Sequence, residues 1–113
     1  MRNCYLVGLT DLYGALDHVR GAIADYLNSL VDLGVAGIRI DAAKHMWPED
    51  ILSMMSRVKD LPTDQGFAPN SKMFVYNEVI DRDDGVVRVD QYYDIGKASI
   101  LSLIHISEPT RPY

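Results

Sequence analysis

A short apolar run that ends in charged residues constrains this chain more than any other feature. Residues 35–40 read Val-Ala-Gly-Ile-Arg-Ile, and Asp41 follows directly. A run of this length is typical of a buried strand. Side chains alternate along a strand, so Arg39 and Asp41 face one side while Ile38 and Ile40 face the other. The pattern predicts a strand whose polar face puts a guanidinium beside a carboxylate at its carboxyl end.

A helix is predicted immediately before this strand. Residues 17–33 carry apolar side chains at three- and four-residue steps, and the strand follows after Gly34. Asp17 is the predicted N-cap, and Gly34 is the predicted C-terminal stop. The predicted buried face consists of Val19, Ala22, Ile23, Tyr26, Leu27, Leu30 and Val31.

A second helix and a second strand follow. Pro48 and two acids mark a helix start, and the stripe that runs to about Lys59 consists of Ile51, Leu52, Met55 and Val58. Residues 73–80 predict a strand with Phe74, Tyr76 and Glu78 on one face. A right-handed crossover makes the two strands parallel neighbours. The sequence therefore predicts an α/β structure, and residues 91–96 predict a further strand or a pocket rim.

Two acids then lie at the carboxyl ends of adjacent parallel strands, where parallel barrels have their active sites. Strands are ~4.8 Å apart. That spacing suits the about 5–5.5 Å between the carboxyl groups of retaining glycosidases. Asp41 would attack the sugar carbon, with Arg39 keeping it ionised, and Glu78 would protonate the leaving oxygen. The alternative is that both acids only cap helices or pair with basic side chains.

Composition excludes some partners. The net charge of −5 argues against nucleic acid, and no apolar run approaches the ~20 residues of a membrane span. The first residues lack the pattern of a signal peptide, which leaves either a cytosolic protein or a missing beginning. The single cysteine, Cys4, is either a lone thiol or half of a disulfide whose partner has been lost.

Three stretches resemble the alpha-amylases of animals. Residues 37–47 resemble their fourth-strand motif, residues 76–81 resemble their fifth-strand motif, and residues 3–12 look like the calcium-side stretch upstream. The resemblance covers residues 2–96 and implies a (β/α)8 TIM barrel. Residues 1–96 would be part of its catalytic domain, containing helix 3, strand 4, helix 4 and strand 5.

The resemblance also implies roles for single residues. Asp41 matches the nucleophile, and Glu78 matches the general acid/base. Arg39 matches a residue beside the nucleophile that binds an activating chloride. Lys44 and His45 match substrate-binding positions.

A calcium site is implied as well. The backbone carbonyls of Arg2 and His45 and the carboxylate of Asp11 match calcium ligands, and oxygen donors are what calcium prefers. Cys4 matches a cysteine whose disulfide partner lies upstream of this chain.

The implied parent protein is a secreted, monomeric, calcium- and chloride-dependent hydrolase of internal α-1,4 links in starch and glycogen. It would have no nucleic-acid or membrane partner. Two alternatives stay open, namely a non-catalytic amylase-like scaffold domain and an α-glucosidase of the same superfamily. The run from Lys44 to Trp47 favours the amylase, and the presence of Asp41 and Glu78 speaks against the scaffold.

The sequence departs from the family in two ways. The third catalytic acid, an Asp on strand seven, is absent, so we predict that this chain alone is inactive and marginally folded. Residues 97–113 match nothing in the family and resemble translated adapter sequence. We predict that they are a non-native tail without a fold or a role.

Overall fold

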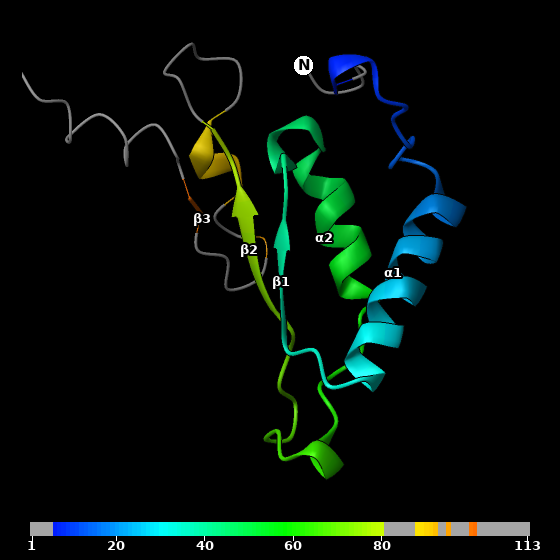
Figure 1. Ribbon diagram of the computed structural model, residues 1–113, viewed down its shortest axis with the longest axis vertical. Helices are drawn as coiled ribbons and strands as arrows, with labels where there is room; N and C mark the ends of the chain where they lie inside the picture. Colours follow the sequence, from blue (N-terminus) through cyan, green and yellow to red (C-terminus); the bar gives the residue numbers. More distant parts are fainter. Residues whose placement is uncertain (1–5, 81–87, 93–94, 96–99, 102–113) are drawn as a thin grey trace, which may run out of the picture.

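The computed structural model describes residues 6–80, 88–92, 95 and 100–101, so Arg2, Cys4 and most of the predicted tail lie outside the described residues. Two helices lie beside a small parallel sheet (Figure 1). The helices are α1 (Asp17–Asp32) and α2 (Pro48–Ser56), and the strands are β1 (Gly37–Ile40), β2 (Phe74–Glu78) and β3 (Ile100–Leu101). Short 3₁₀ turns occur at Leu6–Gly8, Ala43–His45, Thr63–Gln65 and Val89–Tyr92. None of the helices in this part of the chain has the length and apolar character that a bilayer span requires.

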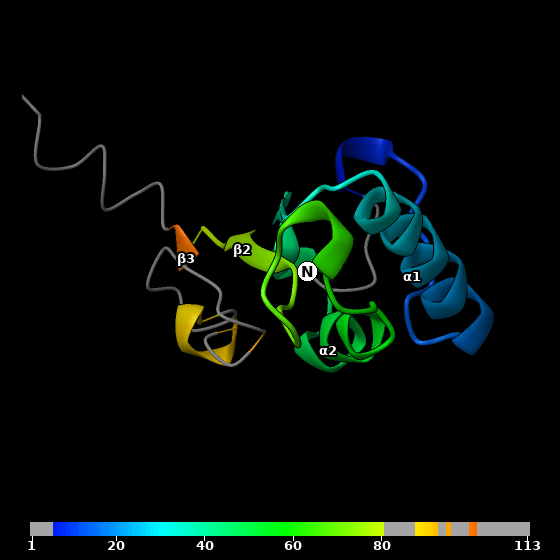
Figure 2. The same ribbon diagram turned by 90° about the horizontal axis from the view of Figure 1, so that it is seen from below.

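The sheet confirms the predicted parallel pair. β1 and β2 run parallel, with Gly37 opposite Phe74 and Arg39 opposite Tyr76. β3 adds to the other edge of β2, on the side away from α1 (Figure 2). Because β3 is only two residues of the predicted tail, the assignment of residues 97–113 stays a prediction.

The helix α1 differs from the prediction in its N-cap and in two residues of its predicted buried face. Leu16 is the N-cap and Asp17 is the first helical residue, so the predicted cap was wrong by one position. Gly34 does end the helix, with a φ of 91° that an L-residue rarely adopts. Tyr26, predicted to be buried, is exposed and borders a groove beside β1, because no described element covers that edge.

Ala22 is also exposed, and Ala24 is buried in its place. In α2, Leu52 of the predicted stripe is exposed, and Met54, which was not predicted, is buried. The rest of the prediction is confirmed, because Leu27 and Val31 of α1, Ile51 of α2 and Val58 after it are buried.

Two apolar clusters join the helices to the strands. One contains Leu27, Val31, Val58, Leu61 and Met73. The other contains Ala43, Ile51, Val79, Tyr92 and Ile95. Tyr92 is fully buried, and its hydroxyl donates to the carbonyl of Met46 at 2.8 Å. The predicted strand or pocket rim near residue 92 is therefore wrong for this side chain, which belongs to the core.

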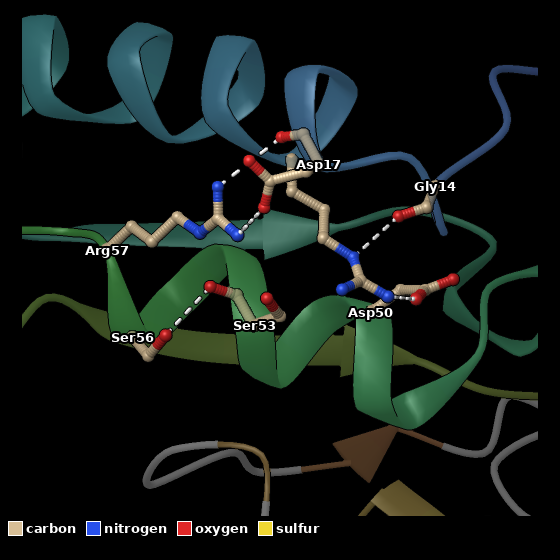
Figure 3. Close-up of polar contacts among 7 residues, drawn as sticks. Gly14, Asp17, Asp50, Ser53, Ser56 and Arg57 are labelled. Atoms are coloured by element: carbon tan, nitrogen blue, oxygen red, sulfur yellow. Dashed lines mark hydrogen bonds and ion pairs between the residues drawn. The ribbon is translucent and has the colours of Figure 1, made fainter.

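Arg57, directly after α2, reaches across to the first turn of α1. Its guanidinium pairs with the Asp17 carboxylate and donates to the Asp17 carbonyl at 3.4 Å (Figure 3). The hydrogen bond and the charge of Arg57 lower the pKa of Asp17 below its ordinary value. The pair ties the two helices together on the solvent side.

This pair predicts a pH dependence of stability. Since the pKa of Asp17 is lowered in the folded state, the contribution is present above the unfolded pKa and is lost as the pH falls through the folded value. In a full-length protein that carries this segment, Asp17→Asn should lower the thermal unfolding midpoint slightly at neutral pH, with the difference vanishing in acid. Asp25→Asn, at another exposed acid of α1, is the control. An equal loss in both variants would contradict the assignment.

Candidate active site

One guanidinium joins the two acids that the sequence singles out. Arg39 Nη1 lies 2.9 Å from Asp41 Oδ1, and Arg39 Nη2 lies 3.0 Å from Glu78 Oε1. Arg39 is in β1, Asp41 follows the last residue of that strand, and Glu78 is the last residue of β2. The predicted convergence of the two acids at the carboxyl ends of adjacent strands is confirmed by these contacts.

The face that carries this site is the one turned away from the helices. The rings of Phe74 and Tyr76 lie 6.2 Å apart on it, which confirms that they share one side of β2 with Glu78. The residues between them, Val75 and Asn77, are buried on the opposite side. The alternation of the strand therefore separates a polar and aromatic face from a core face.

A strained backbone residue completes the contacts of Glu78. Ala42 has a left-handed conformation, with φ 50° and ψ 35°, which is uncommon for a residue with a Cβ. This conformation lets its backbone N–H donate to Glu78 Oε2 at 3.0 Å. Each oxygen of Glu78 therefore accepts from a different N–H group, one of Arg39 and one of the backbone.

The two acids differ in their access to solvent. The Asp41 side chain is 73% exposed, whereas that of Glu78 is 13% exposed, and Arg39 lies between them at 43%. A substrate that approaches this face can reach Asp41 without moving other groups. Glu78 is largely buried, and each of its oxygens accepts a hydrogen bond. A molecule that reaches Glu78 from this face must therefore also contact Arg39.

The residues after β1 form the next part of the site. Lys44 Nζ lies 3.5 Å from the carbonyl oxygen of Ile80, which places this ammonium next to the carboxyl end of β2. His45 is half-buried and lines a cavity of about 290 Å³ on the other side of the turn. The two predicted substrate residues thus lie in one short turn but border different spaces.

Two of the three predicted calcium residues line that cavity. Asp11 and His45 both border it, while Arg2 lies outside the described residues. No cluster of three or more His, Cys, Asp or Glu side chains that could hold a metal occurs in the described ranges. A cation here would need backbone carbonyls besides the Asp11 carboxylate, which is the donor set that the resemblance implies and a suitable one for calcium.

Sequence reasoning missed a partly buried ion pair at the same cavity. Asp50 is buried, lines the cavity and pairs with Arg20 of α1. Asp50 reads as an ordinary acid of a first helical turn, and Arg20 reads as an ordinary charge on a helix. One signal could have indicated this contact. Arg20 and Asp50 each stand next to a residue of the predicted apolar face, and the two helices were predicted to pack on the same sheet.

Known proteins resemble this chain closely over most of its length. No protein-family model matches it. It is 54% identical over 96 residues to the alpha-amylase of Phaedon cochleariae, which covers 85% of this chain and 20% of that protein. It is 46% identical over 99 residues to the pancreatic alpha-amylase of Sus scrofa, which covers 88% of this chain and 19% of that protein.

Solved structures agree with these relatives. The structure superimposes on alpha-amylase I of Eisenia fetida with a TM-score of 0.81 and 41% identity, over 86% of this chain and 19% of that one. The E249Q mutant of that enzyme in complex with maltohexaose gives a TM-score of 0.82 and 40% identity. The chain thus spans about one fifth of the length of the proteins it matches. Over most of its residues, this chain is therefore similar in sequence and in fold to about one fifth of an alpha-amylase.

Proposed function

We propose that this chain is the part of an alpha-amylase that supplies two of its catalytic acids. Asp41 is the nucleophile and Glu78 is the general acid/base. The observation that carries the proposal is the single guanidinium of Arg39, which contacts both carboxylates at the ends of neighbouring parallel strands. The whole protein then hydrolyses internal α-1,4-glucosidic bonds with retention of configuration.

The proposal assigns each element a place in a (β/α)8 barrel. α1, β1, α2 and β2 are helix 3, strand 4, helix 4 and strand 5. Parallel pairing and the helices on one side of the strands support this assignment. The face with Arg39 and Glu78 then points into the barrel interior at its carboxyl end.

The reaction follows the two-step course of a retaining glycosidase. In the first step a carboxylate oxygen of Asp41 bonds to the anomeric carbon, the bond to the leaving sugar oxygen breaks, and that oxygen takes a proton from Glu78. In the second step Glu78 takes a proton from water, whose oxygen replaces Asp41 on the carbon. The exposure of Asp41 supports its role as the attacking group.

Starch and glycogen are the proposed substrates. The maltohexaose complex of the Eisenia fetida relative supports a chain of glucose units as ligand. Lys44 and His45, in the turn that follows Asp41, are the proposed substrate-binding residues. We further propose that the parent protein is secreted and monomeric and has neither a nucleic-acid nor a membrane partner.

Calcium and chloride are the proposed ions. Calcium would be held by the Asp11 carboxylate with the carbonyls of His45 and Arg2, and it would supply rigidity to the loop that carries Asp11. Chloride would bind Arg39. That guanidinium already faces two carboxylates, so a further anion needs positive charge beyond these three residues, and no step of the reaction is assigned to it.

Replacement of either acid tests the proposed roles. In a full-length alpha-amylase that carries this segment, Glu78→Gln should lower kcat on starch by about 10²- to 10⁴-fold, the usual worth of a general acid/base. Asp41→Asn should lower it at least as much, because the covalent step is lost. Glu49→Gln, at an exposed acid of α2, is the matched control. Near-normal hydrolysis by the Asp41 and Glu78 variants would contradict these roles, whereas a parent protein that does not hydrolyse starch would favour the scaffold alternative.

The chain of 113 residues should not hydrolyse starch by itself. The third catalytic acid is expected on a strand outside it, so the site lacks one of the groups that the proposed reaction requires. Its unfolding should be broad, since Phe74 and Tyr26 lie exposed. Reducing-sugar release from soluble starch and thermal circular dichroism check both points. Measurable turnover by the purified chain would refute the first.

A further inference from the structure

One arginine touches both walls of the cavity that contains Asp11 and His45. Arg20 Nε donates to the Gly14 carbonyl at 2.8 Å, and Arg20 Nη2 pairs with the Asp50 carboxylate (Figure 3). Gly14 and Asp50 both line the cavity. Gly14 belongs to the loop of Asp11, and Asp50 belongs to the helix that starts just after His45.

The chemistry of arginine suits this double contact. The guanidinium is planar and presents its donors in fixed directions, so two acceptors bound to it are held in a fixed relation to each other. Asp50 is buried, and a buried carboxylate is retained only with a partner. The ion pair therefore fixes the guanidinium against α2, and the remaining donor fixes the loop.

The loop of Asp11 has little else that orders it by burial. Leu9, Leu12 and Tyr13 are all exposed, so apolar packing contributes little to the position of this segment. The loop nevertheless passes very close to α2, because a Cβ placed on Gly14 would lie 3.2 Å from Asp50 Oδ2. A specific polar contact is the remaining means of holding this close approach.

We infer that Arg20 is a positioning residue for the calcium site. It sets the distance between the loop with Asp11 and the turn with His45, so that the oxygen donors of both meet one cation. It does not itself touch the ion. The inference rests on the calcium site proposed above and adds a residue that lies outside the ligand set.

Calcium titration of a full-length alpha-amylase that carries this segment tests the inference. Calcium is removed with a chelator, and affinity is measured by titration well below the unfolding temperature of each variant. Arg20→Lys keeps the charge beside Asp50 but cannot hold the Gly14 carbonyl at the same time. It should weaken calcium binding by about 10- to 100-fold, the usual effect of a residue that orients metal ligands, while leaving the calcium-free unfolding midpoint near that of the parent.

Arg57→Gln is the matched control. Arg57 also joins α1 to α2, but it contacts Asp17 and is not among the described residues that line the cavity. The calcium affinity of this variant should lie within about twofold of that of the parent. That change is much smaller than the loss of at least about 10-fold expected for a residue that orients metal ligands. An equal loss of affinity in Arg57→Gln and Arg20→Lys would show that any link between the helices has this effect, and it would overturn the inference.

Asp11→Asn separates the two proposals. If Asp11→Asn weakens calcium binding and Arg20→Lys does not, the calcium site stands and the role of Arg20 is wrong. If Asp11→Asn binds calcium as tightly as the parent, the site itself is wrong, and the role of Arg20 falls with it. Weaker binding in both, with Arg57→Gln unchanged, supports the inference.

Discussion

The contact of one arginine with two carboxylates is the interaction on which the structure of the site depends. Arg39 lies on β1, while its partners come from the end of β1 and the end of β2. It offsets part of the repulsion between two acids that the parallel register brings to one point. Without a cation there, the two carboxylates would repel each other, and the exposed Asp41 side chain would turn away from Glu78.

The helices contribute to the site by fixing what lies behind the strands. α1 and α2 pack together on one side of the sheet, and two arginines link them through Asp17 and Asp50 (Figure 3). The outer link lies in solvent, where ion pairs contribute little to stability. The inner link lies beside a cavity and its carboxylate, Asp50, is buried, so its geometry is defined more sharply.

Much of the fold could be predicted from periodicity. The apolar steps of residues 17–33 and the run before Asp41 predicted a helix and a strand that the structure contains. The closeness of Asp41 to Glu78 could be predicted because the carboxyl ends of neighbouring parallel strands lie at the same edge of the sheet. The exact buried stripe did not follow, because exposure of Tyr26 depends on which parts of the sheet edge are covered, and a helical pattern does not contain that information.

The hydrogen bonds around the site depend on backbone geometry that the sequence pattern does not indicate. Nothing in the letters around Ala42 indicates a left-handed residue, although its N–H contacts Glu78. Asn77 is likewise a fully buried amide for which the described part of the chain offers no hydrogen-bond partner. Both features are set by where the ends of β1 and β2 meet, which is a property of the packed structure.

The conformation of Ala42 also restricts how this protein can change over evolutionary time. Glycine and asparagine can adopt the left-handed backbone readily, whereas valine, isoleucine and threonine are strongly disfavoured there. Glycine would relieve the strain, but it would also widen the range of directions in which the N–H can point. Sequence drift at this position is therefore confined to a few small residues by a backbone angle, independently of any contact that the side chain makes.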